Sequence, residues 1–225
     1  MFSKHQSFVV LALLLIALSG CREFGDTSSD EPTQMSAAER EQLIDAVLEA
    51  EREAQKTTPP KPKIVLLTPS GWSRSESRAL PPEDHGFTVA YEQESGLSVT
   101  LYQYTRGHAS IPDGVDSALV KEEMQHAKTG IQQVVQLGYW DAAKEVKFET
   151  VRLGESQRQA LWSQYDLTVD GEVLASDIYV WAYSNTLFKL RCTAHSKDVV
   201  SNQAVLGSLL TALGSPSAGT NNDEE

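Results

Sequence analysis

The sequence predicts an α+β fold in which an antiparallel β-sheet of about six strands packs with two main helices. Apolar runs of strand length follow one another across short turns, and Asp170-Gly171 is the strongest hairpin signal among these turns. Two longer segments, 116–137 and 198–213, instead repeat apolar residues at the helical period. Groups of strands joined by short turns indicate an antiparallel sheet, and the helices must then cover an apolar face of that sheet.

The domain is expected to cover residues 64–214. In chain order we expect a short strand at 64–67, strands at 86–91 and 97–105 around a turn with Gly96, a helix ending at Leu137, strands at 146–153, 160–170, 172–183 and 187–195, and a helix at 198–213. The first helix is predicted to begin at an N-cap, either Asp113 or Asp116, and to stop before Gly138.

Less regular segments flank this domain. Residues 21–35 are polar and acidic and predict a flexible tether, and residues 215–225 predict a disordered tail. Ser36 and Glu39 form a capping-box pattern at the start of a separate helix, 36–56. A Pro-rich spacer, 57–63, follows this helix. The narrow apolar stripe of the helix docks either on the domain or on a partner, and the sequence leaves both open: Leu43, Ile44, Val47 and Leu48.

Residues 1–20 have the pattern of an export signal. Lys4 precedes an apolar run, 8–18, that is too short to span a bilayer, which takes roughly 20 residues. The motif Leu18-Ser19-Gly20-Cys21 resembles the lipobox of bacterial lipoproteins. The resemblance implies cleavage between Gly20 and Cys21, a diacylglyceryl group on the Cys21 thiol, and a fatty acyl chain such as palmitate on its new amino group. The alternative is ordinary cleavage after Ser19 or Gly20, with Cys21 incidental.

The lipoprotein resemblance also implies a location. Several acyl chains anchor a protein stably, at about 0.8 kcal/mol per buried CH₂. Arg22 stands where an aspartate would resemble an inner-membrane retention signal. We therefore expect the periplasmic face of the outer membrane rather than the inner membrane. After cleavage Cys192 is the one remaining unmodified cysteine, so no intramolecular disulfide is expected.

The composition is that of a globular protein. With 40% hydrophobic residues in a chain of 225, it excludes wholesale disorder and collagen-like structure. The 31 Asp and Glu residues outnumber the 19 Lys and Arg residues and give a net charge of −12. Such a surface repels nucleic acid and anionic lipid headgroups, so we expect no nucleic-acid partner and membrane attachment through lipid on Cys21.

The Asp170-Gly171 turn fixes a register between two strands. It places Gln164 opposite Asp177 and Trp162 opposite Tyr179. One face then forms the core, with Leu161, Tyr165, Leu167, Val169, Leu174, Ile178, Val180 and Ala182. A three-residue loop at 184–186 would add Phe188, Leu190, Cys192 and Ala194 to this face, so Cys192 is predicted to be buried and unreactive.

The opposite face supplies the candidate binding site. Its residues are aromatic or charged: Trp162, Asp177, Tyr179, Trp181, Lys189 and Arg191. The same register would place Trp181 opposite Lys189 and Tyr179 opposite Arg191, which suits cation–π contacts. Aromatic residues with arginine are typical of an interaction surface. The alternative is a set of ordinary cross-strand pairs half covered by the N-terminal helix or a loop.

No motif predicts catalysis, a metal or a cofactor. Glu122 and His126 lie four residues apart on a helix without a third ligand nearby, and a surface pair is the simpler interpretation. Cys192 and His195 would point to opposite faces of a strand. Two loop pairs, Asp84 with His85 and Arg106 with His108, are typical of solvated loops but could also belong to a site built across loops.

The layout of the domain resembles the PsbP-like superfamily, which includes the DcrB-type envelope proteins. Three features carry the resemblance: Gly71-Trp72 before the first hairpin, the helix 116–137, and the strand 187–195 leading into the last helix. The resemblance implies an antiparallel sheet between helices and a mostly non-enzymatic role in binding or assembly.

These observations favour a lipid-anchored cell-envelope protein that is a non-enzymatic protein-binding or assembly factor, with an envelope protein as partner. The alternative is a small-ligand carrier or sensor with a pocket between sheet and helix. A hydrolase is a third hypothesis, and it requires His85, His108 or His126 to converge with a carboxylate in a cleft.

Overall fold

The computed structural model describes residues 36–39, 41–42, 45–46, 49, 66, 68–94, 96–153, 157–195, 207, 209 and 211. Several expected segments lie outside the described residues: the signal peptide, the tether, the Pro-rich spacer and the tail. The same holds for most of the expected helices 36–56 and 198–213. The described residues of 37–49 are helical, and the predicted capping box is formed. The backbone N–H of Ser36 donates to Glu39 Oε2 over 2.8 Å, and the backbone N–H of Glu39 donates to Ser36 Oγ over 3.3 Å.

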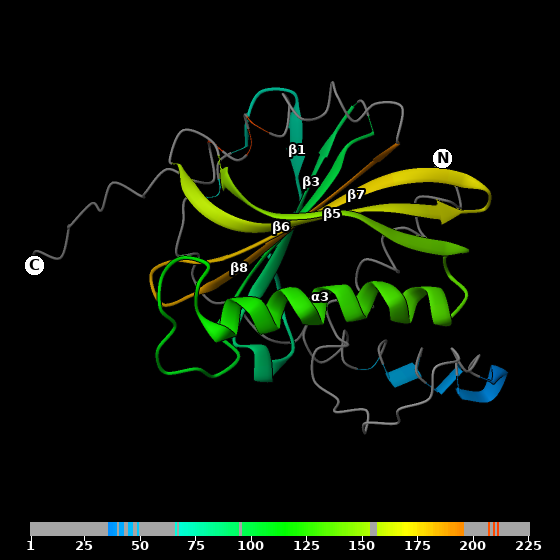
Figure 1. Cartoon of the computed structure of the whole chain (residues 1–225), viewed down its shortest axis with the longest axis horizontal. Helices are drawn as coiled ribbons and strands as arrows, with labels where there is room; N and C mark the ends of the chain where they lie inside the picture. The colour runs from blue at the N-terminus through cyan, green and yellow to red at the C-terminus, as the bar shows by residue number, and fades with distance from the viewer. Residues whose placement is uncertain are drawn as a thin grey trace, which may run out of the picture.

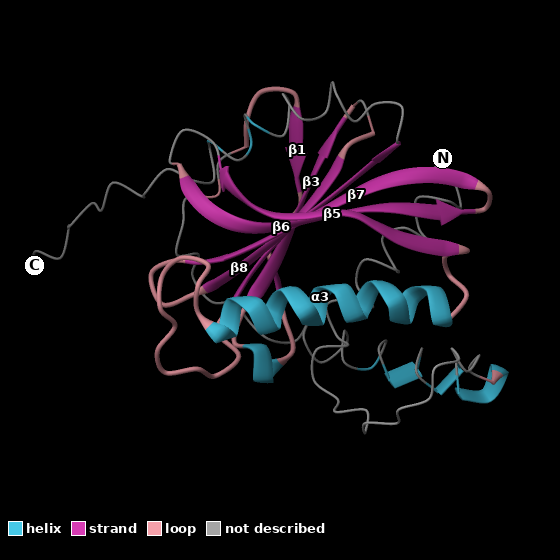
Figure 2. Cartoon of the chain, viewed as in Figure 1, coloured by secondary structure: helices cyan, strands magenta, loops and turns pink. Residues whose placement is uncertain are grey.

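The fold is α+β, built on one antiparallel sheet (Figures 1 and 2). Its strands are β1 (Trp72–Arg74), β2 (Arg78–Ala79), β3 (Phe87–Gln93), β4 (Ser98–Tyr104), β5 (Ala142–Leu153), β6 (Arg158–Val169), β7 (Glu172–Ala182) and β8 (Leu187–His195). They run in the order β1-β3-β4-β8-β7-β6-β5, with β2 paired to β3. The sheet has eight strands rather than about six, because β1 and β2 are too short to show an alternating pattern. Of the expected strand 64–67 only Leu66 is described, and it is not in a strand.

One long helix, α3 (Ala118–Gln136), covers one face of the sheet (Figure 1). Its N-cap is Ser117, whose hydroxyl accepts a hydrogen bond from the backbone N–H of Val120, so the expected cap at Asp113 or Asp116 is wrong by one or more residues. Gly138 ends the helix as predicted, with a φ of 73° in the left-handed region. A short 3₁₀ helix, η2 (Pro82–Asp84), precedes β3. Within the described part of the chain, no helix is both long and apolar enough to cross a membrane.

The register predicted between β6 and β7 is confirmed, but the register between β7 and β8 is wrong. Trp162 pairs with Tyr179, and Gln164 pairs with Asp177. Trp181, however, pairs with Phe188 instead of Lys189, and Tyr179 pairs with Leu190 instead of Arg191.

The cause of the error is the length of the turn. Ser184 and Asn185 both have positive φ, 51° and 57°, and the backbone N–H of Tyr183 donates to the carbonyl of Thr186. This is a two-residue turn of the kind that hairpins favour, not a three-residue loop. A slip of one residue exchanges the two faces of a strand, so every side chain of β8 points to the side opposite the one expected.

Both faces of the central strands are buried. The α3 side of the sheet, which we call the helix face, carries Ile178 and Val180 of β7 together with Lys189 and Arg191 of β8. The far face carries Trp162, Tyr179, Trp181, Leu190 and Cys192, among others. Cys192 is buried as predicted, but on the far face. Leu209, one of the described residues near the C-terminus, is fully buried in the same hydrophobic core.

Candidate functional site

The six residues of the predicted binding face do not share a face. Trp162, Asp177, Tyr179 and Trp181 lie together on the far face, whereas Lys189 and Arg191 lie on the helix face because of the turn length described above. Trp162 and Tyr179 stack with 6.2 Å between ring centroids, and Trp181 stacks on Phe188 at 5.3 Å. Each of these three predicted aromatic residues is at most 8% exposed, so their rings form packing contacts within the domain.

Asp177 is the acceptor at the centre of this face. The indole N–H of Trp162 donates to its Oδ1 over 2.9 Å, and the side-chain amide of Gln164 donates to the same oxygen over 3.0 Å. Burial raises the pKa of Asp177, and these two hydrogen bonds oppose the rise only in part. The carboxylate therefore orients Trp162 and Gln164 on the sheet.

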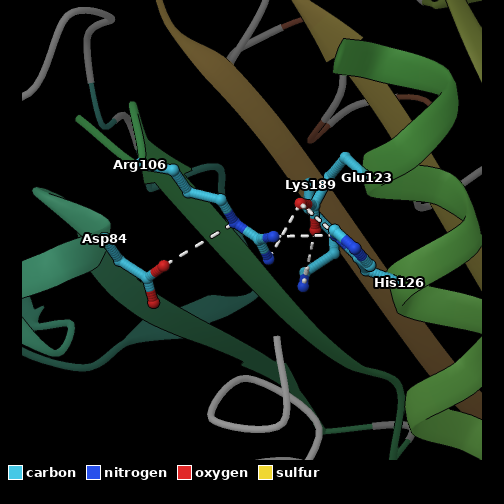
Figure 3. A network of polar contacts seen from close by, with 5 residues as sticks. All are labelled: Asp84, Arg106, Glu123, His126 and Lys189. Atoms are coloured by element: carbon cyan, nitrogen blue, oxygen red, sulfur yellow. Dashed lines mark hydrogen bonds and ion pairs between the residues drawn. The ribbon is translucent and has the colours of Figure 1, made fainter. Parts of the chain in front are cut away.

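A different group of charged residues gathers between the sheet and α3, and we call it the charge cluster: Asp84, Arg106, Glu123, His126 and Lys189 (Figure 3). Arg106 Nη2 lies 2.9 Å from Glu123 Oε2, and Lys189 Nζ lies 3.3 Å from Glu123 Oε1. Arg106 also approaches Asp84, at 3.6 Å from Nε to Oδ1. Its Nη1 lies 2.7 Å from His126 Nδ1, and since a guanidinium only donates, this ring nitrogen accepts.

Four separate segments build this cluster. Asp84 comes from η2, Arg106 from the loop after β4, Glu123 and His126 from α3, and Lys189 from β8. Two of the loop residues considered in the sequence, Asp84 and Arg106, do converge. Neither His85 nor His108 is among the residues joined in the cluster, and His126 contacts Glu123 rather than the Glu122 expected from the i,i+4 spacing.

One signal for this cluster was present in the sequence. Glu123 falls within the apolar stripe of α3, directly beside Met124 and one turn before Ala127. A carboxylate on the buried side of a helix requires cationic partners. The position of Glu123 does not show which cations these are. The wrongly predicted register between β7 and β8 placed Lys189 on the far face, away from α3.

The electrostatics of the cluster are dominated by its two cations. Burial alone would raise the pKa of Glu123, but Lys189 and Arg106 lower it to about 2. Burial raises the pKa of Asp84 against the opposing charge of Arg106. Tyr104 is enclosed beside Glu123, and both burial and that carboxylate raise the pKa of its phenol. Glu123 is thus held ionised as the partner of two cations, which makes it a poor general base near neutral pH.

Arg191 lies two residues further along β8 on the same helix face. It is 3% exposed, and its Nε donates to Ser176 Oγ over 3.2 Å. Its guanidinium carbon lies 5.0 Å from the centre of the Trp140 ring. Within the described chain, Nη1 and Nη2 have no hydrogen-bond partner. Burial lowers the pKa of Arg191 to about 10, so the group stays charged at neutral pH.

The exposed apolar residues gather mainly on β5, which ends the sheet. Val146 and Phe148 are 43% and 51% exposed, and a register irregularity between Glu145 and Lys147 places a bulge at Val146. Lys128 of α3 lies over the Phe148 ring at 3.7 Å. The remaining exposed large apolar residue that the structure describes is Val173 of β7, at 45%.

Among the described residues, no group of three or more His, Cys, Asp and Glu side chains is arranged to hold a metal ion. The arrangement as a whole offers two features for binding: an exposed sheet edge at β5 and a buried cationic layer under α3.

Comparison with known proteins gives structural likeness only. No family model and no curated protein sequence matches the chain. A Pseudomonas aeruginosa protein of unknown function with a suggested regulatory role matches at a TM-score of 0.43 and 9% identity, over 60% of this chain and 88% of its own. Cyanobacterial PsbP (CyanoP) from Synechocystis sp. PCC 6803 matches at a TM-score of 0.42 and 14% identity, over 64% of this chain and 81% of its own. Both likenesses are weak.

Proposed function

We propose that the protein is a lipid-anchored component of the bacterial cell envelope whose domain is a non-enzymatic binding or assembly factor. The anchor is the lipid on Cys21, and the location is the periplasmic face of the outer membrane. Support for the anchor comes from the lipobox pattern at 18–21 and from the acidic charge of the chain, which leaves lipid as the means of attachment.

The partner in this proposal is an extended segment of another envelope protein, which pairs with β5. The observation that carries it is the position and exposure of that strand. β5 has 12 residues at one end of the sheet, whereas β1 at the other end has three. No strand among the described residues pairs with the outer side of β5, so its outward backbone groups can accept an added strand.

The side chains of β5 suit selective pairing. Charged residues along the strand, including the Lys147–Glu149 ion pair at 3.0 Å, discourage indiscriminate association of exposed edges. Val146 and Phe148 still offer exposed apolar area that a matching segment would bury. The far face with Trp162 and Tyr179 is a less suitable docking surface because its aromatic rings already pack within the domain.

In-cell photocrosslinking tests this proposal. A photoreactive amino acid replaces Lys144 on β5 in the full chain, and we expect one discrete protein adduct. The substitution Val146→Lys in the same chain removes the adduct, whereas Val173→Lys, the same change at a residue of similar exposure on β7, leaves it. Loss of the adduct in both variants, or equal labelling from the exposed loop residue Glu76, contradicts capture by β5.

A further inference from the structure

Among the described residues, the buried layer between α3 and the sheet contains one positive charge without an acidic partner. Of the described charged residues, four are buried: Asp84, Glu123, Lys189 and Arg191. Both carboxylates already have cationic partners. Glu123 pairs with Lys189, and Glu123 and Asp84 both pair with the less buried Arg106. No carboxylate of the described chain pairs with Arg191. A charge in this position is unfavourable unless something neutralises it.

The geometry of Arg191 defines what would neutralise it. Its Nε is engaged by Ser176 Oγ, which holds the side chain in place along β8. The two terminal nitrogens, which form the fork of the guanidinium, have no hydrogen-bond partner in the part of the chain that the structure describes. Such a fork matches two oxygens of one planar group, and a carboxylate accepts from both nitrogens at once.

The surroundings of the fork are aromatic and hydroxylic. Trp140 lies over the guanidinium, and the charge of Arg191 acts on the phenols of Tyr102 and Tyr165. Burial raises the pKa of Tyr102 to about 12, with Arg191 opposing the rise, so this phenol is neutral at neutral pH. Neutral aromatic walls suit the apolar body of a small organic acid better than a multiply charged ion.

We propose that the helix face under α3 carries a binding site for a small monocarboxylate, held by the terminal nitrogens of Arg191. A monoanion carries one negative charge, which neutralises the single positive charge of Arg191. A divalent phosphate would add one negative charge too many. The inference goes beyond strand capture at β5 and does not depend on it. The sequence left open a small-ligand carrier or sensor with a pocket between sheet and helix. For that alternative, the inference names the binding residue, Arg191, and the class of ligand.

In this proposal the ligand enters past Trp140. The indole is 5% exposed and lies in the connection between α3 and β5, two residues after Gly138. Nη1 and Nη2 are buried, so a ligand reaches them only by displacing a neighbouring side chain, and we assign this role to Trp140 because its ring lies against the guanidinium. Binding should therefore change the fluorescence of Trp140.

Thermal unfolding of the full chain in detergent micelles tests the site, with sodium acetate and sodium benzoate as probes and sodium chloride at equal ionic strength as reference. We expect the carboxylates to raise the unfolding temperature with a saturable dependence, and chloride to have no such effect. Arg191→Lys keeps the charge but not the fork and should lose the shift. Arg191→Met should lose it too. Arg158→Met is the matched control, since Arg158 also lies over an aromatic ring, at 3.9 Å from that of Tyr183, and should keep the shift.

The outcomes separate the ligand classes. A carboxylate shift that persists in Arg191→Lys, or no shift in the native chain, overturns the proposal, and a shift with inorganic phosphate but not with acetate overturns the choice of carboxylate. Should Arg191→Met fail to fold, the lysine variant alone decides. A second readout is tryptophan fluorescence, which should respond to acetate in the native chain and lose that response in Trp140→Phe. None of these outcomes bears on the crosslink at β5, so the two proposals succeed or fail separately.

Discussion

At the scale of single residues, Gly86 lies directly before β3 and in close contact with β4. A Cβ at this position would lie 2.3 Å from the carbonyl oxygen of Gln103 and 2.5 Å from Cβ of Tyr104. Both obstacles belong to the body of β4 and cannot rotate away. Gly86→Ala is therefore expected to lower the free energy of unfolding by about 1–3 kcal/mol.

Chemical denaturation measures this effect, and the chain offers a matched control. Gly207 is helical, and a Cβ there meets nothing within 4 Å. Gly207→Ala should thus raise the free energy of unfolding by up to about 1 kcal/mol. If the two alanine variants changed stability in the same direction, the steric argument at Gly86 would be wrong.

Glu123 makes stability depend on pH in a predictable direction. Its pKa falls from about 4.5 in the unfolded chain to about 2 in the folded one, since Lys189 and Arg106 overcome the effect of burial. A lowered carboxyl pKa stabilises the folded state above the unfolded pKa, and the contribution is lost as the pH falls from about 4.5 towards 2. The shift corresponds to about 3 kcal/mol.

We therefore expect Glu123→Gln to cost about 3–5 kcal/mol at neutral pH, where it leaves the buried Lys189 without its carboxylate. The difference from the native chain should shrink as the pH falls towards 2. Asp84, whose pKa is raised by burial and also by the charge of Glu123, acts in the opposite direction in the native chain. Glu122→Gln, at the exposed neighbouring position, is the control. Urea denaturation at several pH values decides, and a difference independent of pH would contradict the electrostatic account.

At the scale of elements, the turn between β7 and β8 does two things. Ser184 and Asn185 supply its positive φ values, and the Asn185 side chain also holds the loop before α3. Its Oδ1 accepts from the backbone N–H of Ile111 over 2.6 Å, and its Nδ2 donates to the carbonyl of Ala109. The turn geometry suits glycine at both positions, but only Asn185 provides these two bonds.

Two glycine variants separate these roles. Ser184→Gly should leave the free energy of unfolding within about 0.5 kcal/mol, because relief of the positive φ offsets the added freedom of the unfolded chain. Asn185→Gly should cost about 1–2 kcal/mol through the lost hydrogen bonds. It should also speed hydrogen exchange at the amide of Ile111. Equal exchange at that amide in both variants would exclude the anchoring role.

The same turn shows which parts of the fold could be predicted. Asp170-Gly171 is the standard sequence of a two-residue hairpin turn, and the register that it implied between β6 and β7 is confirmed. Ser184-Asn185 adopts the same kind of turn without that sequence, so its length could not be recognised. The predicted bounds of β8, Leu187–His195, are confirmed. The predicted side to which its residues point is wrong.

The charge cluster depends on the side to which the residues of β8 point, which is why it could not be assembled from the sequence. Lys189 reaches Glu123 only in the observed register. Asp84 and Arg106 reach them through the folding of η2 and the loop after β4, and nothing local to those segments indicates this convergence. Tertiary placement of charged side chains is the part of the site that local patterns do not determine.

At the scale of the whole molecule, the central position of β8 ties together parts of the chain that are far apart in sequence. β8 pairs with β4 on one side and with β7 on the other, so the hairpins of the N-terminal and C-terminal halves form one continuous sheet. The sheet order leaves β5 as its long outer strand, and α3 lies against the helix face where Arg191 is buried. The two proposed binding features thus belong to the edge and the interior of one sheet.

The proposed anchor predicts how the whole chain partitions. Under this proposal, loss of Lys4 with the signal would take the 19 basic residues to 18 against 31 acidic ones and give the mature chain a net charge of −13. Anionic lipid headgroups repel such a chain, and attachment through Cys21 should withstand concentrated salt, which weakens only electrostatic contacts. Cys21→Ala should move the protein to the soluble fraction, whereas Cys192→Ala, which changes the buried thiol, should leave it with the membrane. Membrane fractionation with intact mass measurement decides: release of the native chain by salt, or an unmodified mass at Cys21, would contradict lipid anchoring.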